Sequence, residues 1–136
     1  MKVKLDVGAH KPIRAHDTDA GLDLYAYNGG YIPPHGTKTF GTGVHIELPP
    51  RTCGLLVSKS GLLTKHGISS TGLIDEGYTG EIKVTLINNS DDDYFVSSDD
   101  KISQLVIIPC RYEPVQIVDS LNGGKRGNNG FGSTGK

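Results

Sequence analysis

The stretch Gly72-Leu-Ile-Asp-Glu-Gly-Tyr-Thr-Gly-Glu-Ile-Lys-Val-Thr-Leu-Ile-Asn88 consists of two apolar arms joined by a polar turn. In the second arm, apolar side chains occupy every second position from Ile82 to Leu86, which is the period of a half-buried strand. The turn between the arms contains two glycines, which permit tight backbone angles and close approach. The stretch therefore predicts a rigid β-hairpin on which Asp75 and Tyr78 lie close together.

These two side chains allow two interpretations. A carboxylate beside a phenol on a rigid turn could serve as a base next to a flat ligand. Alternatively, Asp75 is an ordinary turn former and Tyr78 an ordinary strand residue, since Asp and Gly are common in turns. Both interpretations stay open on these residues alone.

The rest of the chain is made of short segments with strand patterns, separated by turn residues and without a long helical pattern. This organisation predicts an all-β sandwich or barrel. Only residues 58–67 could hold a helical turn or two. Besides the hairpin, the expected strands cover residues 1–7, 19–26, 42–48, 53–57, 94–96, 102–109 and 113–118.

Length and composition limit the possibilities. The 136 residues fit a single domain, and 35% hydrophobic residues with 19 glycines suggest short strands and a face completed by other subunits. A net charge of −1 gives no indication of a nucleic-acid surface or an acidic lipid partner. We therefore expect no nucleic-acid partner.

The lack of targeting features and the spacing of the cysteines predict an intracellular protein. No apolar run approaches membrane-spanning length, and residues 1–7 do not resemble a signal peptide. Cys53 and Cys110 have neither metal nor redox spacing, so we expect reduced thiols in a cytoplasmic protein that is not secreted. The five histidines show no zinc-ligand spacing.

Three further segments carry groups suited to phosphate or ligand contacts. The run Ser58-Lys-Ser-Gly61 offers hydroxyls, a cation and a glycine, although a surface turn has the same composition. Gln104 interrupts an apolar strand, and its amide needs partners either in the sheet or in a ligand. The tail from Lys125 to Gly135 holds one guanidinium, one aromatic ring and a Gly-Ser-Thr-Gly run, which suits either a disordered end or a lid over a nucleotide.

Taken in order, these segments resemble the five motifs of the trimeric deoxyuridine triphosphatase (dUTPase) family across nearly the whole chain. One motif would be weak evidence, but five in order are strong. The matching motifs are Ala20-Gly-Leu-Asp-Leu24; Ser58-Lys-Ser-Gly61 with Lys65-His-Gly67; Gly72-Leu-Ile-Asp75 with Tyr78 and Gly80; Lys101-Ile-Ser-Gln104; and Arg126-Gly-Asn-Asn-Gly-Phe-Gly-Ser-Thr-Gly135.

The resemblance implies a jelly-roll-like β-barrel over residues 1–119 and a mobile C-terminal arm over residues 120–136. It implies a homotrimer in which three subunits build each active site. It also implies hydrolysis of dUTP to dUMP and pyrophosphate, which keeps uracil out of DNA and supplies dUMP. Mg²⁺ is expected on the triphosphate oxygens rather than on direct protein ligands.

The resemblance also implies residue roles. Asp75 would be the general base that activates water for attack at the α-phosphorus, and Asp23 a supporting residue. Tyr78 would pack under the deoxyribose, and the hairpin backbone would hydrogen-bond the uracil edge. The substrate contacts implied are Lys59, Ser60, Gly61, Ser69, Gly72, Leu73, Ile74, Tyr78, Lys83, Gln104, Arg126, Phe131, Gly132, Ser133 and Thr134, with Arg126, Ser133 and Thr134 at the γ-phosphate and Phe131 on the base.

The chain departs from the family pattern at a few positions. Ser58-Lys59 replaces the common Pro-Arg, which keeps the charge but loses the bidentate fork of arginine. Ser69 stands where many relatives have Asn, Gly77 where a second carboxylate is usual, and Asn129 where Gly is common. None of these changes affects Asp75.

Two other functions compete with this one. A dCTP deaminase shares the fold, but its chemistry needs a glutamate-centred proton shuttle at the pyrimidine. A trimeric regulatory binding protein, in which catalysis is lost or secondary, belongs to a different class. The intact motifs argue against lost activity but leave a protein partner open.

Overall fold

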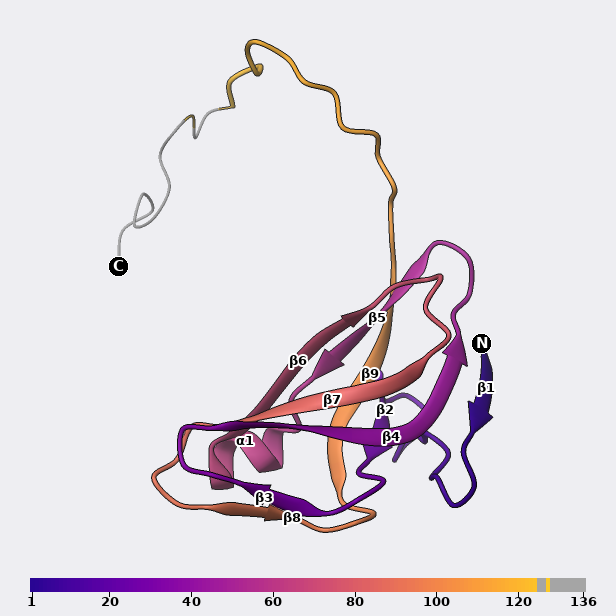
Figure 1. Cartoon of the computed structure of the whole chain (residues 1–136). Coiled ribbons are helices and arrows are strands. Elements are labelled where there is room, and N and C mark those ends of the chain that lie inside the picture. Colours follow the sequence, from indigo (N-terminus) through magenta and orange to yellow (C-terminus); the bar gives the residue numbers. More distant parts are fainter. Residues whose placement is uncertain (125–126, 128–136) are drawn as a thin grey trace.

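The computed structural model describes residues 1–124 and 127, which form a curled antiparallel sheet with a small second sheet beside it (Figure 1). Seven strands pair in the order β1-β4-β7-β6-β5-β9-β2, and β3 pairs with β8. This organisation confirms the all-β expectation. The strands are β1 (Lys2–Leu5), β2 (Gly21–Tyr25), β3 (Gly30–Ile32), β4 (Thr37–Glu47), β5 (Thr52–Val57), β6 (Ile68–Ile74), β7 (Glu81–Asn88), β8 (Tyr94–Val96) and β9 (Lys101–Pro109).

Strand β7 lies inside the sheet, between β4 and β6, and follows the alternation of its sequence. Ile82, Val84 and Leu86 are fully buried, whereas Lys83 and Thr85 between them are exposed. Burying each such aliphatic side chain contributes about 1.5–3 kcal/mol, so the alternation fixes which face of β7 points into the core. The predicted half-buried strand is confirmed.

The hairpin prediction needs one correction. Strands β6 and β7 are antiparallel neighbours, but they pair only where Ile68–Ser70 meets Leu86–Asn88. From Thr71 to Ile74, β6 pairs instead with β5, while the start of β7 pairs with β4. The two arms therefore diverge before the turn, because each continues along a different neighbouring strand.

The helical stretch expected within residues 58–67 forms helix α1, Ser60–His66. The helix ends at Gly67, whose φ of 68° lies in the left-handed region that glycine adopts readily. Within residues 1–124 and 127, no helix is long and apolar enough to cross a membrane.

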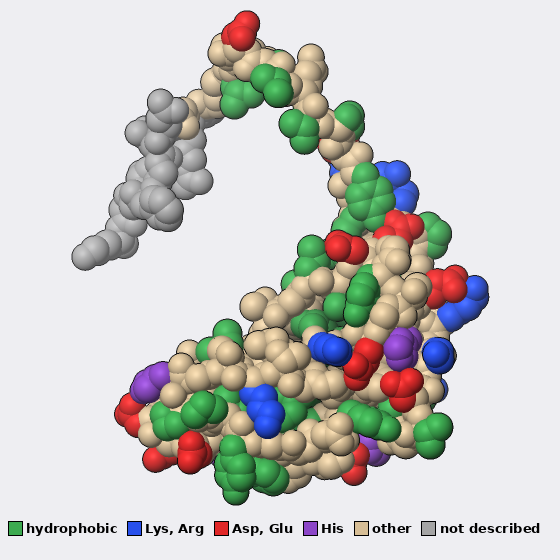
Figure 2. Space-filling view, in the orientation of Figure 1, with side chains coloured by type: hydrophobic (Ala, Val, Ile, Leu, Met, Phe, Trp, Pro, Cys, Tyr) green, Lys and Arg blue, Asp and Glu red, His purple; other side chains and the backbone are tan. Residues whose placement is uncertain are grey.

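Residues 113–118 form no strand in the single chain, so the prediction of a strand there is wrong. After Pro109 the chain leaves the sheet as an extended segment, and Figure 2 shows apolar side chains along it. Val115 and Ile117 are 93% and 95% exposed. Their alternation is typical of a strand, but the sheet of this chain offers residues 113–118 no partner. The boundary between barrel and arm at residue 119 stays a prediction.

Candidate active site

A pocket of about 200 Å³ opens where β6 and β7 diverge. Five of the residues that line it were predicted as site residues, and Glu81 is an addition. The lining residues are Leu73, Ile74, Asp75, Tyr78, Glu81 and Lys83. The structure therefore brings the predicted base and the predicted sugar-facing ring to one pocket, and both side chains are exposed to solvent.

Short contacts hold the turn that carries these two side chains. The Tyr78 amide donates to the Asp75 carbonyl at 3.0 Å, and the Tyr78 hydroxyl donates to the Glu81 carbonyl at 2.8 Å. The ring of Tyr78 thus lies across the turn and over Gly80, where a Cβ atom would come within 2.5 Å of the tyrosine hydroxyl. Only glycine at position 80 leaves the ring in this place.

Glu81 anchors the start of β7 to an irregularity in β4. The register of the β4–β7 pair shifts between Gly41 and His45, and the Gly43 amide there donates to Oε1 of Glu81 at 3.0 Å. The Thr42 hydroxyl donates to the carbonyl of Ile82 at 2.7 Å. These bonds fix the strand end that presents Lys83 to the pocket.

Backbone groups face the pocket as well as side chains. Among the described strands, none pairs with the β7-facing edge of β6 from Thr71 to Ile74. Backbone N–H and C=O groups on such an edge must bond to water or to a ligand. The divergence of the hairpin arms therefore creates a row of donors and acceptors beside Asp75.

Glu76, beside Asp75, ties the turn to two other segments. Its Oε2 accepts a hydrogen bond from the Tyr112 hydroxyl and one from the Arg51 amide at 3.0 Å. The Tyr112 hydrogen bond, followed by that of Arg51, lowers the pKa of Glu76, and the same contact raises the pKa of Tyr112 to about 12. The sequence gives no sign of the contact between Glu76 and Tyr112, because it joins residues far apart in the chain.

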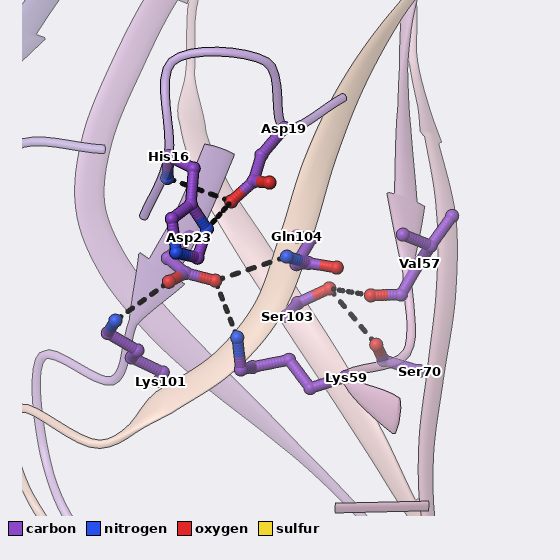
Figure 3. A network of polar contacts seen from close by, with 9 residues as sticks. All are labelled: His16, Asp19, Asp23, Val57, Lys59, Ser70, Lys101, Ser103 and Gln104. Atoms are coloured by element: carbon purple, nitrogen blue, oxygen red, sulfur yellow. Dashed lines mark hydrogen bonds and ion pairs between the residues drawn. The ribbon is translucent and has the colours of Figure 1, made fainter. Parts of the chain in front are cut away.

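A second cluster surrounds Asp23, which is only 3% exposed (Figure 3). Nζ of Lys59 lies 2.5 Å from Oδ1 of Asp23, and Nζ of Lys101 lies 2.8 Å from Oδ2. Nε2 of Gln104 also donates to Oδ1 at 3.3 Å. The predicted Asp23, Lys59 and Gln104 are thus in direct contact, and Lys101 is an additional member of the cluster.

The charges of this cluster favour an anion. Burial opposes ionisation of Asp23, but the hydrogen bonds and charges of Lys101 and Lys59 outweigh it and lower the pKa of Asp23. One carboxylate faces two ammonium groups, so one positive charge is left over. Such a surplus suits a phosphate oxygen.

Ser58 holds the loop before α1 against β6. Its hydroxyl donates to the carbonyl of Ser70 at 2.9 Å and accepts from the Ser70 amide at 2.8 Å. The Ser70 hydroxyl in turn lies 3.0 Å from that of Ser103, which donates to the Val57 carbonyl at 3.0 Å (Figure 3). The serine that replaces the common proline therefore fixes the position from which Lys59 and Ser60 extend.

The two clusters lie apart within one chain. Asp23 pairs with Gln104 of β9, Gln104 with Val57 of β5, and Val57 with Thr71 of β6, so the Asp23 cluster lies level with the middle of β6 and three strands away from it. The turn with Asp75 lies four residues further along the chain than Thr71, roughly 13 Å, and the three strand steps from β6 to β2 add roughly 14 Å across the sheet. One chain thus carries two partial sites, not one closed site.

The remaining predicted residues fall in different places. Ser69 lies at the far end of β6 from Asp75, where its hydroxyl accepts from Asn89 at 3.1 Å. Gly72 lies on the β5-paired part of β6. Arg126, Phe131, Gly132, Ser133 and Thr134 lie outside the described residues.

No group of three or more His, Cys, Asp or Glu side chains that could hold a metal ion occurs within the described part of the chain. Both oxygens of Asp23 are already engaged by ammonium groups.

The family model for dUTPase matches residues 8–135. The chain belongs to the dUTPase family. It is 44% identical to a deoxyuridine 5'-triphosphate nucleotidohydrolase of Clostridium acetobutylicum, over 97% of this chain and 93% of that protein. It is 37% identical to the protein of the same name from Kluyveromyces lactis, over 100% of this chain and 94% of that one.

Solved dUTPases have the same fold. A Staphylococcus bacteriophage 80alpha dUTPase with bound dUPNHPP superimposes with a TM-score of 0.93 at 28% identity, covering 99% of this chain and 98% of the phage chain. A mutant dUTPase of phage phi11, described as coordinating a structural Mg(II) ion, has a TM-score of 0.81 at 27% identity, covering 88% of this chain and 96% of that chain. The expected jelly-roll-like fold is confirmed.

Proposed function

We propose that this protein hydrolyses dUTP to dUMP and pyrophosphate, with Asp75 as the base that activates the attacking water. One observation carries the proposal: Asp75 and Tyr78 share a pocket with the unpaired edge of β6. Family membership supports the substrate class.

The unpaired edge of β6 suits recognition of a pyrimidine. Uracil offers alternating carbonyl acceptors and an N–H donor, which a strand edge can pair as a neighbouring strand would. Cytosine presents a different donor pattern and would leave buried polar groups unpaired, which is heavily penalised. Strand backbone close to the ring would also exclude a methyl group, as on thymine.

Tyr78 would discriminate the sugar. Its ring is fixed over Gly80 by the hydrogen bond to the Glu81 carbonyl. A flat ring held in one place packs under a deoxyribose and leaves no room for a 2′-hydroxyl. Discrimination would therefore come from a steric contact that does not depend on charge.

The cluster at Asp23 would bind the α- and β-phosphates. Ser60 and Gly61 directly follow Lys59 at the start of α1, and Gln104 donates to the Asp23 oxygen that Lys59 also approaches. Asp23 would position these cations, since both of its oxygens hold ammonium groups. The tail residues Arg126, Ser133 and Thr134 would hold the γ-phosphate, and Phe131 with Gly132 would cover the base.

At the reaction centre, the Asp75 carboxylate would accept a proton from a water molecule as that water attacks the α-phosphorus. The bond from the α-phosphorus to the bridging oxygen breaks, and pyrophosphate leaves. Mg²⁺ bound to the triphosphate would neutralise charge and fix the phosphate geometry.

We propose that the active unit is a homotrimer, because the Asp75 pocket and the Asp23 cluster lie apart on the sheet of one chain. A second copy could place its phosphate cluster against the pocket of the first. The exposed apolar side chains of the segment after Pro109, among them Val115 and Ile117, suit burial against another copy.

The test is a pyrophosphate-release assay with dUTP, dTTP, dCTP and UTP, each in the presence of Mg²⁺. We expect rapid release from dUTP and at most slow release from the other three. Equal rates for dUTP and dTTP would overturn the proposed base recognition. Ammonia release from dCTP would instead assign a deaminase.

A further inference from the structure

The two cysteines, which are far apart in the sequence, become neighbours in the fold. In the antiparallel β5–β9 pair, Cys53 lies opposite Ile108. Cys110 follows two residues later and lies opposite Arg51, to whose carbonyl its amide donates at 2.7 Å. Since side chains alternate along a strand, the register places both cysteines on one face as diagonal neighbours.

Both thiols line one pocket of about 570 Å³, together with Leu73, Asp75 and Tyr112. Both are free and half-buried, so a small reagent can reach them. The neighbouring Cys53 thiol is the main reason why the pKa of Cys110 is raised, which agrees with two thiols that lie close together. This pocket shares Leu73 and Asp75 with the pocket between β6 and β7.

We propose that Cys53 and Cys110 form a redox-responsive dithiol that a small-molecule disulfide converts into an intramolecular disulfide. One protein thiolate attacks the small disulfide, which gives a mixed disulfide and releases one small thiol. The second cysteine then attacks the protein sulfur of that mixed disulfide and displaces the second small thiol. Two protein thiols are oxidised, and one small disulfide is reduced to two thiols.

The geometry gives this reaction a structural consequence. Diagonal neighbours across a strand pair have Cα atoms about 7–8 Å apart, whereas a disulfide needs about 4.4–6.8 Å. Cys110 must therefore move toward β5. It follows the end of β9 at Pro109, and its amide donates to the carbonyl of Arg51, the residue that precedes β5.

This movement would reach the turn with the proposed base. Tyr112 follows Cys110 by two residues, and its hydroxyl donates to Glu76, beside Asp75. A disulfide that pulls Cys110 toward β5 would strain this contact and redirect the segment that leads to the arm. The effect on turnover rests on the proposed function, whereas the formation of the disulfide does not.

The disulfide is tested on the full chain. The reduced protein is incubated with glutathione disulfide, quenched with acid, alkylated and mapped as peptides without reduction. We expect a peptide pair that joins Cys53 to Cys110 within one chain, with both thiols lost. Separate glutathione adducts on each cysteine, or links only between chains, would overturn the proposal.

The variants Cys53→Ser and Cys110→Ser are the matched controls. Each should keep the turnover of the reduced protein and stop at a single glutathione adduct. Oxidised wild type should lose turnover of dUTP several-fold, and dithiothreitol should restore it, while both variants keep their turnover. A fully linked protein with unchanged turnover would refute the coupling to Asp75. If the reduced protein does not hydrolyse dUTP, the proposed function fails, yet the peptide map still decides the disulfide.

Discussion

Nζ of Lys101 lies 2.8 Å from Oδ2 of Asp23, and this ion pair joins β9 to β2 beside the proposed phosphate contacts. Lys59 approaches the other oxygen of the same carboxylate from the loop before α1. Asp23 therefore organises two cations that come from different parts of the chain. A carboxylate in this position would support an anion site without touching the anion.

The first prediction concerns the pH dependence of stability at Asp23. Its pKa is lowered in the folded state, so the ionised form stabilises the fold. This contribution is fully present above the unfolded-state pKa of about 3.9 and is lost as the pH falls through the folded-state value. Asp23→Asn should lower the free energy of unfolding by about 2 kcal/mol at neutral pH.

Urea unfolding of wild type and Asp23→Asn from pH 7 down to pH 3 measures this effect. The difference between the two proteins should stay level down to about pH 4 and shrink below it. A difference that does not change with pH would show that the charge of Asp23 is not the cause.

The second prediction concerns sugar selection by Tyr78. Tyr78→Ala removes the ring over Gly80, so the ratio of kcat/KM for dUTP to that for UTP should fall by about tenfold or more. The control Tyr78→Phe keeps the ring and loses only the hydrogen bond to the Glu81 carbonyl, so it should retain most of the selectivity. An unchanged ratio in Tyr78→Ala would remove Tyr78 from the sugar site.

The third prediction concerns removal of Mg²⁺. Chelation should abolish turnover of dUTP, because we expect the ion on the triphosphate. It should leave the Tm of the nucleotide-free protein unchanged, since the described residues contain no cluster of metal-ligating side chains. Calorimetry with and without chelator measures Tm, and a drop in Tm without nucleotide would indicate a structural metal site instead.

The fourth prediction concerns the tail. Deletion of residues 125–136 removes Arg126 and Phe131 and should lower turnover strongly. The buried core lies within β2 to β9 and their connections, so Tm should change little. The affinity of the truncated chain for dUMP should stay close to that of wild type, whereas its affinity for dUTP should fall, since only dUTP has a γ-phosphate. Loss of the folded state on truncation would contradict the proposed lid.

The sequence predicted what local pattern and motif chemistry can encode. The alternation from Ile82 to Leu86 fixes the buried face of β7, and the motif residues Asp75 and Tyr78 do share a pocket. The alternation at Val115 and Ile117 indicated a strand. It could not predict that no strand in the described sheet of this chain pairs with that segment.

Contacts between segments that are distant in the chain could not be predicted from the sequence. The register of β5 with β9 makes Cys53 and Cys110 neighbours, and no spacing along the chain reveals this. The bond between Glu76 and Tyr112 depends on the path that the chain takes after β9. Likewise, the divergence of β6 from β7 depends on their outer neighbours β5 and β4.

The central claim is that one chain carries two partial sites, which a second copy joins. The most direct test mixes two inactive variants by co-refolding: Asp75→Asn, and the double variant Ser60→Ala with Gln104→Ala. Each alone should show little pyrophosphate release from dUTP. Mixed oligomers should regain activity, because the intact Asp75 of one chain can meet the intact phosphate cluster of another. If the mixture forms mixed oligomers and stays as inactive as its components, the shared site is contradicted.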